Sequence, residues 1–202
     1  KLYTCSTIMF YWGVDKQYAN IAHHNVFLGG DYKASFDQIF EDHTLPDVPS
    51  FYVHAPKRTD PAAELVAVGD NRNRRDWNLR VLETLRDHLG LIQHLSIHRY
   101  WSSGTALASS EEAYYNLQYG AQHVDADIRE ARRVIDYFTG TANGRHKIGI
   151  AFDEWGVWHA DARIGSRYEA PSTWRDALAA AAALDVFHSH CDAVSMANLA
   201  QI

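Results

Sequence analysis

The stretch Lys147-Ile148-Gly149-Ile150-Ala151-Phe152-Asp153-Glu154-Trp155-Gly156 decides the fold class of this chain. Residues 148–152 are nearly all apolar, which indicates a short strand buried on both faces, as in a parallel sheet. Two carboxylates, an aromatic residue and a glycine follow directly. In folds that alternate strands and helices, catalytic groups collect at the carboxyl ends of strands and in the loops after them. We therefore expect Asp153 and Glu154 to lie at the end of a buried parallel strand.

The sequence on both sides of this stretch alternates between strand and helix patterns. We expect strands over 64–68, 91–100, 147–153 and 193–199, and helices over 76–89, 109–138 and 177–188. In the longest helix the apolar residues recur in steps of three and four, the spacing of one buried face, although Gly120 weakens its middle by about 1 kcal/mol relative to Ala. Such alternation implies parallel strands with right-handed crossovers. Four units of this kind cannot close an eight-stranded barrel, so we expect an α/β fold that is either half of a barrel or a short open sheet.

Residues 1–60 have a different character, with short β-rich stretches and turn signals. We expect strands over 6–12, 25–28 and 50–54 and a helix over 32–40. His23 and His24 fall between these elements and are interpreted as a loop pair. The change in pattern near residue 60 predicts two domains, a small β-rich segment over 1–60 and an α/β domain over 61–202.

Composition and charge exclude several classes of protein. The 202 residues carry 25 Asp and Glu against 19 Lys and Arg, and the resulting net charge of −6 argues against a dedicated nucleic-acid binder. No apolar run approaches the roughly 18 residues of a membrane helix, so we expect no membrane span. The two cysteines make no disulfide framework. The chain begins at Lys1 and no secretory pattern follows, so we expect a processed, truncated or partial chain. The sequence leaves export and location open, and our expectation leans to the cytoplasm.

Polar side chains also occupy the strand that precedes the longest helix. Alternation in Ser96-Ile97-His98-Arg99-Tyr100-Trp101 puts His98 and Tyr100 on one face. They could bind a neighbouring carboxylate or a sugar hydroxyl, or they could be ordinary polar tips of a strand end. Likewise, Asp153 or Glu154 could act as a nucleophile or general base at an anomeric carbon, or could cap or pair locally. His188, His190 and Cys191 have metal-binding side chains, but they lie at a helix end, where His often caps carbonyls, so we expect no metal there.

Residues 61–202 resemble the C-terminal half of the catalytic barrel of family 51 glycoside hydrolases, the α-L-arabinofuranosidases. The matching stretches are Glu64-Leu65-Val66-Ala67-Val68-Gly69, Leu95-Ser96-Ile97-His98-Arg99-Tyr100-Trp101, Phe152-Asp153-Glu154-Trp155-Gly156-Val157-Trp158, Arg175-Asp176-Ala177-Leu178 and Met196-Ala197-Asn198-Leu199-Ala200-Gln201. The resemblance implies strands five to eight of a (β/α)8 TIM barrel and a substrate that contains arabinose, with no cofactor. It further implies that Glu154 is the catalytic nucleophile, that Tyr100 lies beside it, and that Gln201 faces the arabinose site.

The chain departs from this family in one respect. The family's acid/base glutamate follows a Gly-Asn-Glu motif, and that motif does not occur here. A retaining mechanism needs two carboxyl groups about 5–5.5 Å apart. Asp153 is not expected to replace the missing group, because neighbours on a strand point to opposite faces. Half a barrel also leaves sheet edges uncovered, so we expect self-association or a partner that completes the barrel.

Residues 1–60 resemble an internal segment of phytoene desaturases, which are flavin-dependent carotenoid enzymes. Residues 3–15 and 49–56 carry this resemblance. The flavin fingerprint Gly-x-Gly-x-x-Gly is absent from the sequence, so we expect no FAD binding. Three hypotheses follow: a glycoside hydrolase fragment that is inactive if the acid/base is missing, a desaturase-like oxidoreductase fragment, and a non-catalytic composite of two unrelated pieces.

Overall fold

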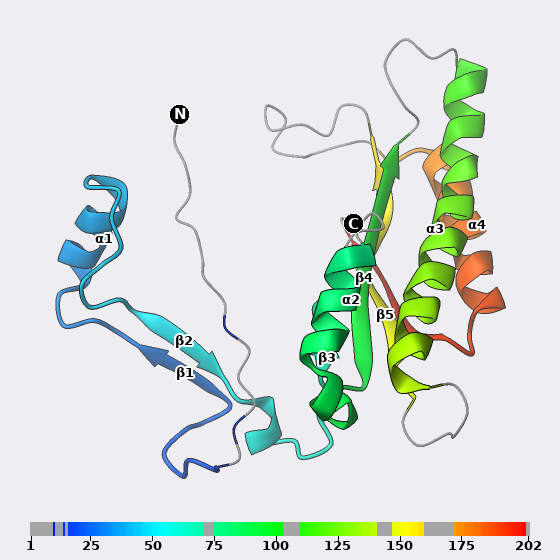
Figure 1. The fold of residues 1–202 in the computed structure, drawn as a ribbon. Coiled ribbons are helices and arrows are strands. Elements are labelled where there is room, and N and C mark those ends of the chain that lie inside the picture. Colours follow the sequence, from blue (N-terminus) through cyan, green and yellow to red (C-terminus); the bar gives the residue numbers. More distant parts are fainter. Residues whose placement is uncertain are drawn as a thin grey trace. The chain divides into compact units, whose positions relative to one another are not determined.

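The structure, a computed structural model, describes residues 10, 14, 16–70, 75–102, 110–140, 147–159 and 172–200. The chain divides into two compact units, Lys1–Ala63 and Glu64–Ile202. Each unit is described by itself below, with its elements labelled as in Figure 1.

The first unit is built on a two-stranded antiparallel sheet. Strands β1 (His24–Phe27) and β2 (Phe51–His54) flank helix α1 (Tyr32–Phe40), and the 3-10 helix η1 (Pro56–Arg58) follows β2. Asp31 caps α1, because its Oδ1 accepts the Ala34 N–H at 2.8 Å. These elements confirm the strands and the helix expected over 25–28, 50–54 and 32–40. The strand expected over 6–12 lies outside the described residues except at Phe10.

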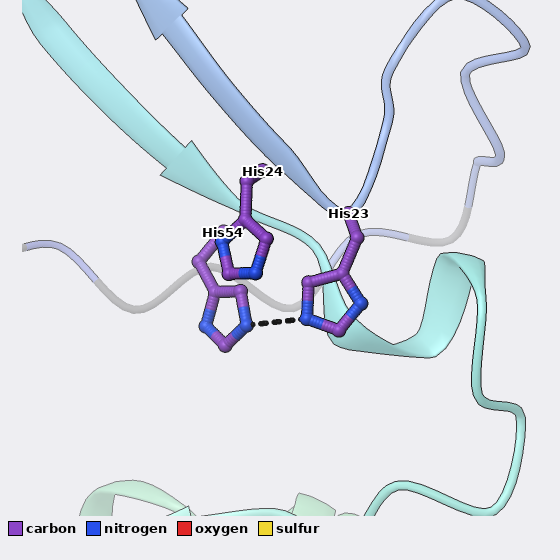
Figure 2. Close-up of side chains that lie close together, drawn as sticks. All are labelled: His23, His24 and His54. Carbon is purple, nitrogen blue, oxygen red and sulfur yellow. Dashed lines mark hydrogen bonds between the residues drawn. The ribbon is translucent and has the colours of Figure 1, made fainter.

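The first unit corrects the interpretation of one histidine pair. His24 opens β1 and lies opposite His54, the last residue of β2 (Figure 2). The expectation that His23 and His24 form a loop pair is therefore wrong for His24. The reason is that strand pairing continues to the end of the hairpin, where the Ala55 N–H still donates to the His23 carbonyl oxygen at 2.8 Å.

The second unit is a four-stranded parallel sheet with helices between its strands. Strands β3 (Val66–Ala67), β4 (His94–Ser102), β5 (Gly149–Trp158) and β6 (Val194–Leu199) lie side by side in chain order. All three neighbouring pairs are parallel, which confirms the expected order and direction. The helical connections are α2 (Arg75–Thr84), the 3-10 helix η2 (Arg86–Leu91), α3 (Ser110–Thr139) and α4 (Trp174–Ser189).

The two faces of strand β4 differ: one is apolar and contacts helix α3, and the other is polar. Its odd-numbered residues include the buried Leu95 and Ile97. Arg99 and Trp101, further along this face, bind helix α3: Arg99 forms a bidentate ion pair with Asp127, and the Trp101 indole N–H donates to a helix carbonyl at 2.9 Å. The even-numbered residues of β4 are polar and form the opposite face, which carries the candidate site.

Helix α3 runs for 30 residues without a break at Gly120. The expected weakness at this glycine is offset by a close contact, since a Cβ added there would lie 2.0 Å from Nε1 of Trp101. The glycine thus lets the helix approach β4. Val124, Ile128 and Ile135 continue the same face into the core, where each is fully buried.

Several boundaries differ from those expected, and three of them bear on the site. Helix α2 ends at Thr84 instead of residue 89, because the chain tightens into a 3-10 turn in which the His88 N–H donates to the Leu85 carbonyl at 2.7 Å. Strands β4 and β5 both run further, and they stay paired as far as Ser102 and Trp158. Asp153 and Glu154 therefore lie within a strand and not after its end. No helix in the described ranges is both long and apolar enough to cross a membrane.

Candidate active site

A bulge in β5 shapes the candidate site. Ser96 of β4 pairs with Ala151 of β5, but His98, two residues on, pairs with Glu154, three residues on. Strand β5 therefore holds one extra residue at this point. In such a bulge two residues of one strand oppose a single residue of its neighbour.

The bulge changes the face of the sheet on which the side chains of residues 152–155 lie. Phe152 and Trp155 both contact Phe187 of α4, with ring centroids 5.0 Å apart in each case. Between them, Asp153 and Glu154 both reach the polar face. The pattern along the strand is therefore apolar, acidic, acidic, apolar, with the two apolar side chains in the core and the two acids on the other side.

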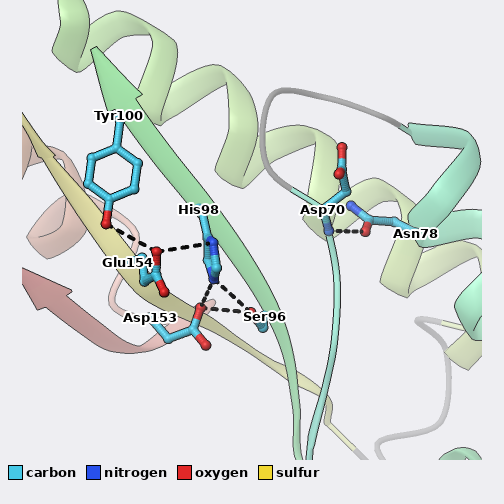
Figure 3. Close-up of polar contacts among 7 residues, drawn as sticks. All are labelled: Asp70, Asn78, Ser96, His98, Tyr100, Asp153 and Glu154. Atoms are coloured by element: carbon cyan, nitrogen blue, oxygen red, sulfur yellow. Dashed lines mark hydrogen bonds and ion pairs between the residues drawn. The ribbon is translucent and has the colours of Figure 1, made fainter. Parts of the chain in front are cut away.

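One imidazole lies between these two carboxylates (Figure 3). His98 Nε2 lies 2.9 Å from Asp153 Oδ1, and His98 Nδ1 lies 3.6 Å from Glu154 Oε2. The Tyr100 hydroxyl donates to Glu154 Oε2 at 3.1 Å, and the Ser96 hydroxyl donates to Asp153 Oδ1 at 2.7 Å. Two adjacent strands thus hold an acid pair between three polar side chains.

The expectation that Asp153 and Glu154 point to opposite faces is wrong. Strict alternation holds only for a regular strand, and the extra residue in β5 breaks it. The sequence does contain a signal for this. In a regular strand Phe152 and Trp155 would lie on opposite faces, so two large apolar residues around an acid pair favour a bulge between them.

The Tyr100 hydroxyl is held in its protonated form. Partial burial raises its pKa, and the hydrogen bond to Glu154 and the negative charges of Glu154 and Asp153 raise it further, to about 12. Tyr100 is therefore a hydrogen-bond donor to Glu154 at every pH at which the protein would work. The side chain of Glu154 is 51% exposed, so a molecule in solution can reach this carboxylate.

The chain that follows β3 lies close to Ser96 of β4. A Cβ at Gly69 would lie 1.9 Å from the carbonyl oxygen of Ser96, so only glycine allows this approach. Directly after it, the Asp70 backbone N–H donates to Oδ1 of the buried Asn78 of α2 at 2.9 Å (Figure 3). These contacts fix the chain beside Ser96 and the acid pair.

A second polar group lies deeper on the same face of β4. His94 Nδ1 lies 2.7 Å from the Ser195 hydroxyl, and His94 Nε2 lies 2.5 Å from Glu64 Oε2. His94, Ser96 and Asp153 were not predicted to be members of a polar face. The even-numbered positions of β4, which read His, Ser, His, Tyr, were the signal for it.

The other expected residues have different outcomes. The structure brings His98, Tyr100 and Glu154 together, in agreement with the expectation that His98 and Tyr100 lie on one face of their strand. Gln201 lies outside the described residues. His190, at the end of α4, contacts Asp125 of α3 at 2.7 Å, and the free Cys191 next to it is exposed.

Comparisons with known proteins give different relatives for different parts of the chain. The family model "Alpha-L-arabinofuranosidase C-terminal domain" matches residues 153–202. An "Intracellular exo-alpha-(1->5)-L-arabinofuranosidase" of Halalkalibacterium halodurans is 31% identical over an alignment of 162 residues, and this alignment covers 72% of this chain. The crystal structure of the family GH51 arabinofuranosidase from Xanthomonas axonopodis pv. citri has a TM-score of 0.58 at 24% identity and covers 71% of this chain. A phytoene desaturase of Cercospora nicotianae is 50% identical over 60 residues, or 30% of this chain.

This chain resembles two families. Residues 61–202 resemble the family 51 arabinofuranosidases and share their α/β fold, and residues 1–60 resemble a segment of phytoene desaturase. The chain spans 30% of the length of the arabinofuranosidase relative and 10% of the length of the desaturase.

Proposed function

We propose that residues 61–202 carry the nucleophile side of a retaining α-L-arabinofuranosidase site, on strands five to eight of a (β/α)8 barrel. The observation that carries this proposal is the position of Glu154, an accessible carboxylate held by Tyr100 and His98 on the polar face of a parallel sheet. The resemblance of this region to family 51 arabinofuranosidases supports the substrate class, which is a glycan with terminal arabinofuranosyl groups.

Glu154 is the nucleophile in this mechanism. Its free carboxylate oxygen forms a bond to the anomeric carbon while the bond from that carbon to the leaving oxygen breaks, and the leaving group takes the electron pair. Tyr100 donates a hydrogen bond to the other carboxylate oxygen, which orients the attacking one. Water then attacks the same carbon, the bond between that carbon and Glu154 breaks with its electron pair returning to the carboxylate, and the water's proton passes to solvent, which leaves arabinose and free Glu154.

His98 and Asp153 bind and orient in this proposal. His98 contacts both acids, so it holds Glu154 in place and can bind a sugar hydroxyl at the rim of the site. Gln201 is proposed to face the sugar, as the family resemblance implies.

Protonation of the leaving group is the weak step. The Gly-Asn-Glu motif that carries the family's acid/base is absent from the sequence. A general acid contributes about 10²–10⁴-fold to such reactions. We therefore propose that the chain is inactive on natural arabinans unless a partner supplies this acid, and that any activity is confined to substrates with good leaving groups.

The test is hydrolysis of 4-nitrophenyl α-L-arabinofuranoside by the wild type, by Glu154→Gln and by Glu83→Gln, an exposed carboxylate of α2 that serves as a matched control. We expect slow hydrolysis by the wild type and the control, and a loss of at least about 100-fold in Glu154→Gln. Circular dichroism checks that all three are equally folded. Equal rates in the wild type and Glu154→Gln would remove Glu154 from the chemistry, and no rate in any of the three would favour the non-catalytic composite.

The resemblance of residues 1–60 to phytoene desaturase supports a second proposal, an oxidoreductase fragment. This segment matches about a tenth of the desaturase, and the sequence has no Gly-x-Gly-x-x-Gly fingerprint. We therefore propose that the segment binds no FAD by itself and that the chain is a composite joined near residues 60–63. A flavin absorption band that stays with the purified chain through gel filtration would contradict this.

A cytoplasmic location is part of the proposal. Its support is the similarity to the intracellular arabinofuranosidase of Halalkalibacterium halodurans. Fractionation of cells that express the chain from its native gene would test the location, and recovery in the medium would contradict it.

A further inference from the structure

Three histidines meet at the open end of the hairpin in the first unit. His24 is the first residue of β1 and pairs with His54, the last residue of β2, while His23 directly precedes β1. Directly opposed residues in an antiparallel pair have Cβ atoms about 4.5–5.5 Å apart. Figure 2 shows the three imidazoles side by side, with the rings of His24 and His54 stacked.

The distances between these rings suit a shared ligand. Nε2 of His23 and Nε2 of His54 are 2.9 Å apart, and one potential ligand atom from each of the three rings lies within 4.8 Å of the others. Nitrogens on one tetrahedral Zn²⁺ lie about 3.3 Å apart, given Zn–N bonds of about 2.0–2.1 Å. His24 and His54 are exposed and His23 is half-buried, so the proposal requires the side chains to rotate from the first arrangement to the second.

The remaining ring nitrogens are already bound to hydroxyl groups. His23 Nδ1 lies 2.5 Å from the Thr59 hydroxyl, and His24 Nδ1 contacts the Tyr52 hydroxyl. Metal-binding histidines are usually oriented in this way, with the second ring nitrogen bound to a polar group of the protein. These contacts leave the Nε2 atoms of His23 and His24 as the available ligand atoms, and on metal binding His23 Nε2 would exchange its contact with His54 Nε2 for the metal.

We propose that His23, His24 and His54 bind a divalent transition-metal ion, with Zn²⁺ as the ion that best fits three neutral imidazoles and an open fourth position. Imidazole is a common ligand of Zn²⁺ and Cu²⁺ and a poor one for Mg²⁺ and Ca²⁺. The site lies in the segment that resembles phytoene desaturase and is independent of the sugar site proposed above.

The experiment is calorimetric titration of the full, untagged and metal-free chain with ZnCl₂ at about pH 7.5, where free histidine is mostly neutral. We expect one Zn²⁺ per chain. In His54→Phe, which keeps a β-forming aromatic residue but no ligand atom, we expect a loss of affinity of at least about tenfold. Tyr52→Phe keeps all three ligands and should weaken binding less than His54→Phe does.

A matched control separates the cluster from the other histidines of the chain, which has 12 in all. His43 is an exposed histidine of the same unit at a positive φ of 55°, where Asn is well tolerated. His43→Asn should bind Zn²⁺ like the wild type, whereas His54→Asn should not. Absence of stoichiometric binding in the wild type, or equal affinity in His54→Phe and the wild type, would overturn the proposal. Cu²⁺ provides a second readout, because nitrogen couplings in its electron paramagnetic resonance spectrum should be lost in His54→Phe.

Discussion

At the scale of single residues, the pair formed by Tyr100 and Glu154 has the clearest chemical consequence. A phenol that donates to a carboxylate loses its proton with difficulty, since the phenolate would face a negative charge. The titration of Tyr100 therefore reports on its contact with Glu154, and this effect can be measured.

The first prediction concerns the titration of Tyr100. The absorbance of tyrosinate in the wild type minus that in Tyr100→Phe should reveal one tyrosine with a pKa of about 12. Glu154→Gln should lower this pKa, but not to the ordinary value of about 10, because partial burial remains. Since folding raises this pKa, the contact stabilises the fold fully below about pH 10 and loses that effect as the pH rises toward 12. A Tyr100 that titrates at the ordinary value would contradict the hydrogen bond.

At the scale of elements, the pattern of the sequence was sufficient for the existence and order of the strands but not for their local geometry. The apolar run Ile148 to Phe152 correctly indicated a buried strand, and the steps of three and four correctly indicated α3. The bulge at Asp153 was missed because strict alternation was assumed, although the spacing of Phe152 and Trp155 was a signal for it. The contact between Gly120 and Trp101 was missed because it depends on how α3 packs on β4, and their distance in the sequence gives no sign of it.

The second prediction concerns Gly120 and uses Gly90 as its control. Ala at either position gains helix propensity, at most about 1 kcal/mol. At Gly120 the new Cβ would meet the Trp101 ring at 2.0 Å, and overpacking of this kind costs about 1–3 kcal/mol. We therefore expect Gly120→Ala to lower the free energy of unfolding. Gly90→Ala, whose added Cβ would meet nothing within 4 Å beyond its own chain neighbours, should keep the free energy of unfolding or raise it by up to about 1 kcal/mol. Urea denaturation of the two variants measures the difference, and equal stability would show that α3 can move away from β4 at no cost.

At the scale of the whole molecule, the domain boundary and the state of association remain proposals. The boundary between the two compact units falls between Ala63 and Glu64 of the chain, close to the change in sequence pattern near residue 60. In the sheet of the second unit, as far as the structure describes it, β3 and β6 are the outer strands. Met196 and Leu199 of β6 are among the exposed large apolar residues. Unprotected sheet edges of this kind pair readily with other chains.

The third prediction is that the chain self-associates through β6. Light scattering on the wild type should give a mass above that of the monomer. Met196→Lys should shift the mass toward the monomer, because a charge on an outer strand opposes pairing. Leu184→Lys, which removes an exposed apolar residue from α4 instead, should leave the mass unchanged. A monodisperse wild-type monomer would mean that this edge is protected.

The bulge in β5 has a consequence for how this strand could vary. If Asp153 were deleted, plain alternation would still direct Phe152 and Trp155 inward and Glu154 outward. The second acid is therefore an addition to a strand that is complete without it, and the core on the far side is the same in both cases. A single insertion or deletion could therefore add or remove a negative charge here without changing the packing of Phe152 and Trp155. The buried residues of this strand are constrained, but the charge on its exposed face is free to change.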